Sequence, residues 1–190
     1  AVTAIAPSFG GINLEDISVP NCFYIEEKLK ELLKIPVFHD DQHGTATVIL
    51  AGLINALKVV KKDRARVRVV ISGAGAAGIA AAYLLLHYGV KNIILTDRHG
   101  MIHAGRDNLL PYKKKIAKVT NRENLSGSLE DAMKNADVFI GLSAPNILTP
   151  KMVKSMARDP IIFALSNPAP EIMPDIAKKA GAKVVATGRS

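Results

Sequence analysis

The feature that most constrains the fold is a glycine-rich turn between a predicted strand and a predicted helix. Gly73, Gly75 and Gly78 spell the motif G-x-G-x-x-G within the stretch SGAGAAG. A mostly apolar run over 67–71 leads directly into the motif, and an Ala- and Leu-rich stretch over 76–88 follows it. A strand, a glycine turn and a helix in this order are typical of a dinucleotide-binding unit. The sequence therefore predicts that this unit binds the pyrophosphate of a nicotinamide dinucleotide.

Each glycine has its own physical role in such a turn. Gly73 permits the tight turn, Gly75 leaves room for the pyrophosphate, and Gly78 lets the helix approach the strand closely. The phosphates then meet unpaired backbone N–H groups at the positive end of the helix. We expect the whole turn to contact the cofactor, that is Gly73, Ala74, Gly75, Ala76, Ala77 and Gly78.

The choice between NAD and NADP depends on two neighbouring residues. Asp97 ends the next predicted strand, about 20 residues beyond the turn, where an acid can accept hydrogen bonds from the adenosine ribose and repel a 2′-phosphate. Arg98 follows directly and could instead pair with that phosphate. The sequence favours NAD and leaves NADP open.

Elsewhere the chain alternates predicted strands and helices. The expected strands cover 35–38, 67–71, 92–96, 137–141, 161–165 and 183–186, and the expected helices 25–33, 44–60, 76–88 and 109–118. Start signals of three more helices lie at Ser128 with Asp131, at Thr149 with Pro150, and at Pro174. The expected fold class is α/β, a doubly wound, mostly parallel, Rossmann-like sheet with helices on both faces, in a single domain.

Two pairs of neighbouring acids lie outside the dinucleotide unit, Glu15 with Asp16 and Asp40 with Asp41. Their oxygens could hold Mg²⁺ or Mn²⁺. Consecutive residues of a strand point to opposite faces, so Glu15 and Asp16 could share an ion only if the backbone there is irregular. Alternatively, all four acids are solvated and merely complement the start of a helix. The residues alone leave both possibilities open.

Composition limits the partners and the compartment. The formal charge of +8 comes without aromatic residues interleaved among the basic ones, and no nucleic-acid motif occurs, so we expect no nucleic-acid partner. Cys22 is the single cysteine, which excludes an intrachain disulfide and fits a reducing compartment. We find no signal peptide and no apolar run long enough for a membrane span. We therefore expect a cytoplasmic protein without a membrane partner.

Four segments resemble the malic enzyme family, in particular its shorter prokaryotic members. They are GGINLED at 10–16, FHDDQHGT at 38–45, SGAGAAG at 72–78 and ALSNPAPE at 164–171. The second is the most specific, and together they run in order through essentially the whole chain. The resemblance implies oxidative decarboxylation of L-malate to pyruvate and CO₂, with reduction of NAD or NADP and a required Mg²⁺ or Mn²⁺.

The resemblance also implies roles for individual residues. Glu15, Asp16 and Asp41 would be the metal ligands, and Asp40 beside them would have a supporting catalytic role. Asn167 falls where the family has an asparagine near the nicotinamide and the substrate carboxylate. From the residues and the resemblance together, the predicted site comprises the glycine turn, Asp97 with Arg98, the four acids and this asparagine.

The family's catalytic tyrosine and lysine belong to an amino-terminal domain that these 190 residues lack. We therefore expect residues 1–190 to be the NAD(P)-binding domain of a malic enzyme, with 1–45 carrying the metal-site acids, and we expect the isolated chain to be inactive. The resemblance further implies a homo-oligomer. Two alternatives remain: a malolactic enzyme, which converts malate to lactate, and a non-catalytic dinucleotide-binding module.

Overall fold

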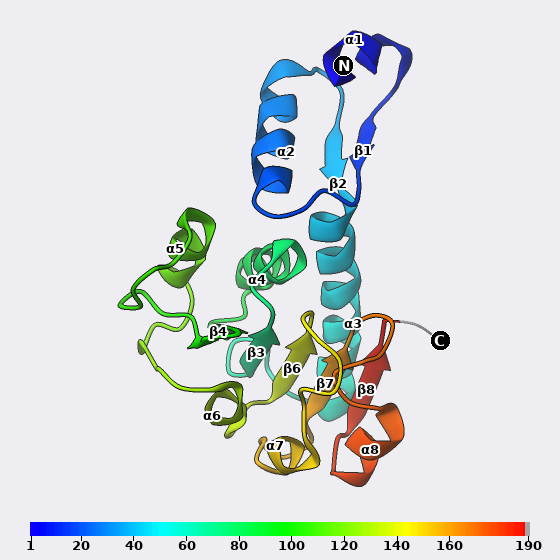
Figure 1. Cartoon of the computed structure of the whole chain (residues 1–190). Helices are drawn as coiled ribbons and strands as arrows, with labels where there is room; N and C mark the ends of the chain where they lie inside the picture. Colours follow the sequence, from blue (N-terminus) through cyan, green and yellow to red (C-terminus); the bar gives the residue numbers. More distant parts are fainter. Residues whose placement is uncertain (189–190) are drawn as a thin grey trace.

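The computed structural model describes residues 1–188, and a six-stranded sheet forms its centre (Figure 1). The strand order is β5-β4-β3-β6-β7-β8, and only β5 runs antiparallel to its neighbour. The strands are β3 (Arg68–Ser72), β4 (Asn92–Asp97), β5 (Gly100–Met101), β6 (Val138–Gly141), β7 (Ile161–Ala164) and β8 (Val184–Thr187). The predicted fold class, a doubly wound and mostly parallel α/β sheet, is confirmed.

The order of the strands creates a switch point in the middle of the sheet. From β3 the chain moves outward to β4 and β5, and then returns to β6 on the other side of β3. Ser72 at the end of β3 therefore lies between Thr96 of β4 and Gly141 of β6. In open α/β sheets, ligands bind outside the carboxyl ends of the strands at such a point.

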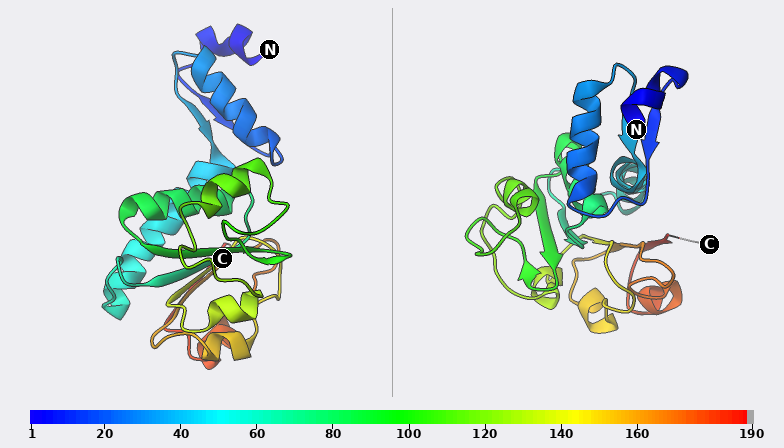
Figure 2. Two further views of the ribbon diagram at one scale, coloured as in Figure 1. Left: turned by 90° about the vertical axis from the view of Figure 1, so that its left-hand side faces the viewer. Right: turned by 45° about the horizontal axis from the view of Figure 1, so that its top comes forward.

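Helices cover both faces of the sheet (Figures 1 and 2). Val69 and Ile71 of β3 pack with the helices of one face, whereas Val70 between them packs with the other, as the alternation of strand side chains requires. One face is covered by α3 (Thr45–Val60), α4 (Ala76–Tyr88) and α5 (Pro111–Ala117), and the other by α6 (Leu129–Met133), α7 (Pro150–Lys154) and α8 (Pro174–Lys179).

The helix start signals read from the sequence are confirmed. The Ser128 hydroxyl accepts a hydrogen bond from the Asp131 N–H, and the Asp131 carboxylate accepts one from the Ser128 N–H, which is a complete capping box. The Thr149 hydroxyl accepts a hydrogen bond from the Met152 N–H at 3.2 Å, and α7 starts at Pro150, directly after Thr149. Pro174 is the first residue of α8. Such caps satisfy backbone N–H groups that a helix cannot pair internally.

The amino-terminal residues form a small lobe of their own, drawn in blue in Figure 1. It consists of α1 (Val2–Ile5), the 3₁₀ turn η1 (Ala6–Ser8), β1 (Ile12–Leu14), α2 (Asn21–Leu32) and β2 (Val37–His39). The two strands pair in parallel with each other only. Leu14, Leu29 and Val37 form a separate apolar cluster between strand and helix. The strand predicted near 35–38 thus lies outside the main sheet.

A π-helical turn, η2 (Asp40–Gly44), joins the lobe to α3. By length and composition the segment Asp40–Val60 could cross a membrane. Ile49 and Leu53 of this segment are nevertheless buried in the core shared with α4 and the sheet. Only 28% of this apolar stretch is buried, however, and Val48 and Val59 are exposed, so burial in the core accounts for only part of its apolar residues. The expectation that no segment is long and apolar enough for a membrane span is therefore not upheld by length and composition.

Candidate cofactor and metal site

A cleft of about 660 Å³ opens beside the switch point of the sheet. Its wall combines the start of α4, the acids of η2 and the segments that follow β6, β7 and β8. The lining residues are Asp40, Asp41, Gly44, Thr45, Val48, Gly75, Ala76, Ala77, Gly78, Leu142, Ser143, Leu165, Ser166, Asn167, Thr187 and Gly188. The fold thus brings together the dinucleotide motif, one predicted acid pair and the predicted asparagine.

The glycine turn has the geometry that its sequence predicts. Gly73 has φ +113°, and a Cβ there would lie 2.5 Å from the carbonyl oxygen of Leu142. At Gly78 a Cβ would lie 1.9 Å from the carbonyl oxygen of Gly73. Around Gly75, by contrast, no atom lies within 4 Å of such a Cβ, and the residue faces the cleft. The first and third glycines are therefore required by packing, and the second keeps the cleft open.

The amino terminus of α4 faces the same cleft. Its cap residue Gly75 has no side chain, so no cap hydrogen bond satisfies the first turn. The N–H groups of that turn, from Ala76 to Gly78, lack partners within the helix and line the cleft. Together with the helix dipole they form a binding site suited to phosphate.

The two acid pairs meet through one hydrogen bond from a backbone N–H to a side-chain carboxylate. Asp16, the second residue after β1, donates its N–H to Oδ2 of Asp41 at 2.9 Å. Its φ of +56° is left-handed, a region that a non-glycine residue adopts only with strain. The backbone after β1 is therefore irregular, which is the condition that the sequence set for a shared ion at Glu15 and Asp16.

Only two of the four acids lie in the lining of the cleft. Asp40 and Asp41 line the cleft, whereas Glu15 and Asp16 do not. Asp40 lies against Gly44, where a Cβ would come within 2.2 Å of Oδ1. Among residues 1–188, no three His, Cys, Asp or Glu side chains are grouped closely enough to hold a metal ion. The donor set itself, carboxylates only, is the chemistry that Mg²⁺ and Mn²⁺ prefer.

A buried histidine, His39, lies close to Asp41. The side chain of His39 is fully buried, and neither of its ring nitrogens has a hydrogen-bond partner. Its Nε2 lies 3.8 Å from Oδ2 of Asp41. Buried polar groups without a partner are rare in native structures. A small movement of Asp41 would therefore bring its carboxylate within hydrogen-bonding distance of His39.

Glu26 of α2 holds the π-helical turn in place, a role that the sequence did not reveal. The carboxylate is 5% exposed and accepts hydrogen bonds from Gln42 at 3.0 Å and, through Oε1, from Lys30 at 2.7 Å. His43 Nε2 also lies 2.7 Å from Oε1. Burial would raise the pKa of Glu26, but the Lys30 and His43 contacts outweigh it and lower the pKa. These contacts fix the turn that carries Asp40 and Asp41.

Glu171 connects by hydrogen bonds the segments that follow β6 and β7, both of which line the cleft. It is fully buried, and its carboxylate accepts the N–H of Ser143 and the N–H of Ser166, each at 3.1 Å. Asn167, next to Ser166, lines the cleft, and its role beside the nicotinamide and the substrate carboxylate stays a prediction. The sequence argument missed Glu171, although a charged residue at the end of ALSNPAPE was a visible signal.

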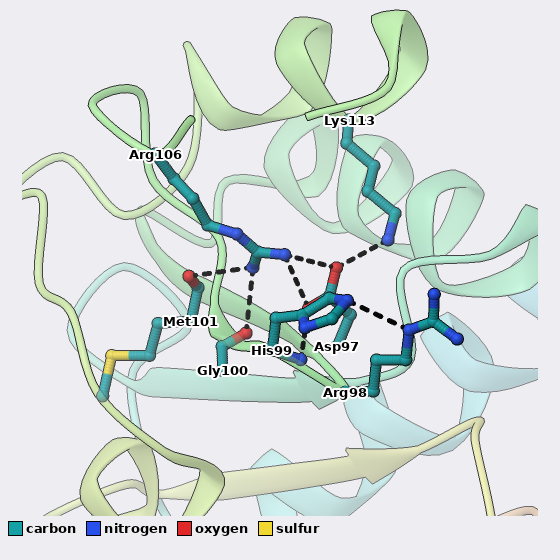
Figure 3. A network of polar contacts seen from close by, with 7 residues as sticks. All are labelled: Asp97, Arg98, His99, Gly100, Met101, Arg106 and Lys113. Atoms are coloured by element: carbon teal, nitrogen blue, oxygen red, sulfur yellow. Dashed lines mark hydrogen bonds and ion pairs between the residues drawn. The ribbon is translucent and has the colours of Figure 1, made fainter. Parts of the chain in front are cut away.

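Asp97 and Arg98 lie at the end of β4, outside the lining of the cleft. Asp97 contacts two cations from the following loop and helix, Arg106 and Lys113 (Figure 3). Burial would raise the pKa of Asp97, but hydrogen bonds from Lys113, the His99 N–H and Arg106 lower it overall. The sequence singled out Asp97 and Arg98 but gave no sign of these partners.

The family model and the sequence relatives that match this chain indicate the same family. Residues 42–189 match the family described as malic enzyme, NAD binding domain. The NAD-dependent malic enzyme of Geobacillus stearothermophilus is 60% identical over the whole chain, and the bifunctional malic/malolactic enzyme of Bacillus subtilis is 57% identical. The chain covers 39% and 46% of these two proteins.

A solved structure agrees with the sequence relatives. The NAD-dependent malic enzyme of Thermotoga maritima superposes with a TM-score of 0.95 and is 52% identical, with all of this chain and 51% of that one covered. The chain thus spans about half or less of the length of these proteins. The match covers the whole chain and therefore includes both the sheet and the small lobe. This chain therefore belongs to the malic enzyme family, and its residues 42–189 correspond to the NAD-binding domain of that family.

Proposed function

We propose that this chain supplies the cofactor and metal sites of an enzyme that oxidises L-malate to pyruvate and CO₂ and reduces NAD or NADP. The observation that supports the proposal best is the composition of one cleft. The N-terminal turn of α4, the acids of η2 and Asn167 line it together. A redox sensor that only binds a dinucleotide has no use for acids in that cleft.

The residues of the chain would divide the work as follows. The N–H groups at the start of α4 bind the pyrophosphate of the cofactor. Asn167 orients the nicotinamide and the substrate carboxylate by hydrogen bonds. Glu171 does not touch either ligand but keeps Ser143 and the segment around Ser166 at their observed separation.

The family resemblance implies that Glu15, Asp16 and Asp41 would hold the divalent ion, with Asp40 supporting the reaction beside them. In residues 1–188 these side chains are not grouped closely enough to do so as they stand. When bound, such an ion supplies a Lewis acid that stabilises negative charge on the malate oxygen during hydride transfer and decarboxylation. The acid and base that move the protons come from the part of the enzyme outside these residues. The isolated chain is expected to bind the cofactor without converting malate.

The test compares the chain with the full-length enzyme that contains it. The chain should bind NAD or NADP but produce no reduced cofactor from malate and Mn²⁺. The full-length enzyme should release pyruvate under the same conditions. Turnover by the chain alone would contradict the division of roles, and absence of any product from the full-length enzyme would favour the non-catalytic module.

A second function has a specific observation behind it. The Bacillus subtilis relative is named a bifunctional malic/malolactic enzyme. Release of lactate from malate, with no net reduction of the cofactor, would assign the malolactic reaction. Quantifying pyruvate, lactate and reduced cofactor in one reaction mixture separates the two outcomes.

A further inference from the structure

A second hollow lies at the end of the molecule away from the cofactor cleft. Helices α3 and α4 both start beside the cleft and end beside this hollow. The 13 residues of α4 separate the two sites by about 20 Å. The hollow measures about 430 Å³, and its apolar floor consists of Ile54, Leu57 and Tyr88. We call it the cationic hollow because its lining also includes Lys58, Lys61, Lys62 and Arg64.

Three of the four cations are not paired with an acid. Lys62 is paired, since its Nζ donates to Oδ1 of Asp137 at 2.7 Å. Within residues 1–188, none of the side chains of Lys58, Lys61 and Arg64 forms an ion pair. Three positive charges at the cationic hollow are therefore available to a ligand.

Negative groups nearby offset only part of this charge. Asp63, the one acid among the lining residues, accepts the Ala65 N–H at 2.9 Å and lies 3.9 Å from Nε of Arg66, which is outside the lining. Both α3 and α4 end here, and the carboxyl end of a helix carries about half a negative charge. The two helix ends together offset about one of the three free positive charges, so about two remain.

The free lysines are not needed to cap α3. The N–H groups of Lys61 and Lys62 both donate to the carbonyl oxygen of Leu57, so the backbone itself satisfies that helix end. Lys58 and Lys61 are three residues apart, a spacing at which like charges repel each other across a helix surface. A bound anion would remove this repulsion.

Arg64 is held in position before any ligand arrives. The carbon at the centre of its guanidinium lies 4.7 Å from the centroid of the Tyr88 ring, which is a cation–π contact. Gly89 ends α4 in the left-handed conformation, with φ +105°, and a Cβ there would lie 3.2 Å from Nε of Arg64. The missing side chain of Gly89 thus leaves room for the guanidinium. A guanidinium presents its N–H groups in a fork that matches phosphate oxygens.

From this arrangement we propose that the cationic hollow binds a phosphate monoester of a small organic molecule. The phosphate pairs with Arg64 and the two free lysines, and the organic group contacts the apolar floor. A phosphate monoester carries about 1.5–2 negative charges at pH 7, which matches the charge that the surroundings leave uncompensated. The site is separate from the cofactor site and does not depend on it.

An NMR titration of the chain with phenyl phosphate tests the proposal. NAD is present at saturation, so that the ester does not occupy the amino end of α4. The resonances of the Arg64 Nε–H and of the Tyr88 ring should shift, with a Kd of about 1 mM or tighter. No shift of these two resonances up to about 10 mM ester overturns the proposal. If NAD does not bind, the cofactor site fails, but these resonances still report on the cationic hollow.

Two related compounds test the chemistry of the ligand. Phenyl sulfate keeps the ring but carries a single charge, and inorganic phosphate keeps the charge but has no group for the apolar floor. Both should bind more weakly than phenyl phosphate, and all three should bind more weakly as the salt concentration is raised. Equal binding of phenyl sulfate would contradict the match of two charges, and equal binding of inorganic phosphate would contradict the role of the floor.

A pair of variants separates a defined site from general attraction by charge. Arg64→Gln should weaken the binding of phenyl phosphate about tenfold. Arg66→Gln removes the same charge from the same loop, at a side chain that is 90% exposed and outside the lining, and should change the affinity less than about twofold. Thermal unfolding followed by circular dichroism checks that both variants fold. Equal weakening by the two substitutions would overturn the proposal, because net charge alone would then attract the ester.

Discussion

The backbone N–H of Asp16 donates to Oδ2 of Asp41 at 2.9 Å, across 25 residues of sequence. This bond ties the amino-terminal lobe to the turn that lines the cofactor cleft. It also places two of the proposed metal ligands next to each other. The proposed metal binding and the docking of the lobe would therefore depend on the same carboxylate.

Asp41→Asn should separate these two roles. The amide oxygen can still accept the Asp16 N–H, so the fold should persist, but the loss of charge should weaken Mn²⁺ binding at least about tenfold. Calorimetric titration of the folded protein with Mn²⁺ measures the effect. Asp107→Asn, at an exposed acid in the loop before α5, is the control. Unchanged Mn²⁺ affinity in Asp41→Asn would remove Asp41 from the metal site.

The glycine turn offers a paired test of packing against binding. Gly78→Ala places a methyl group 1.9 Å from the Gly73 carbonyl oxygen, so we expect a loss of about 1–3 kcal/mol in the free energy of unfolding. Gly75→Ala meets no protein atom within 4 Å and should leave stability nearly unchanged while weakening cofactor binding. Urea denaturation and cofactor titration of both variants check this. Similar stability losses in the two would contradict the assigned roles.

How far the sequence predicts this molecule depends on how local each signal is. The helix predicted at 76–88 is observed with the same bounds as α4. Its signals, the glycines at its two ends and the apolar residues between them, are local and extend over only a few residues. The partners of Asp97 were not predictable in this way. Arg106 lies nine residues beyond it and Lys113 sixteen, across an irregular loop without any periodic pattern. Only the folded loop shows that they meet.

The same reasoning explains the unforeseen role of Glu171. Its contact with Ser143 spans 28 residues and two different loops. Nothing in the spacing of the sequence indicates that these loops meet, because their separation is set by the pairing of β6 with β7. The residues alone left open whether the acid pairs of Asp16 and Asp41 meet, and the family resemblance then implied that both are metal ligands. Positioning residues of this kind become visible only when the sheet has aligned its loops.

Glu171→Gln should destabilise the loops around the cleft. The amide keeps one oxygen acceptor but turns an NH₂ group toward the second backbone N–H, leaving a buried donor unpaired. We expect a loss of about 1–3 kcal/mol in the free energy of unfolding, together with weaker cofactor binding. Glu31→Gln, at a residue whose side chain is 65% exposed, should change stability by less than about 0.5 kcal/mol. Equal effects of the two substitutions would show that Glu171 does not hold the loops.

Acid should destabilise the chain partly through Asp97. Burial would raise the pKa of this carboxyl, but the hydrogen bonds from Lys113, His99 and Arg106 outweigh burial and hold the pKa below its usual value of 3.8. The unfolded chain therefore takes up this proton at a higher pH than the folded chain does. The stability that the carboxylate contributes is complete above about pH 5 and is lost as the pH falls through the lowered pKa. Asp97→Asn should lower stability at neutral pH but flatten its decline between about pH 5 and pH 3. Urea unfolding across this range measures the slope, and an equally steep decline in Asp97→Asn would assign the acid sensitivity to other carboxylates, such as Glu26, whose pKa is also lowered.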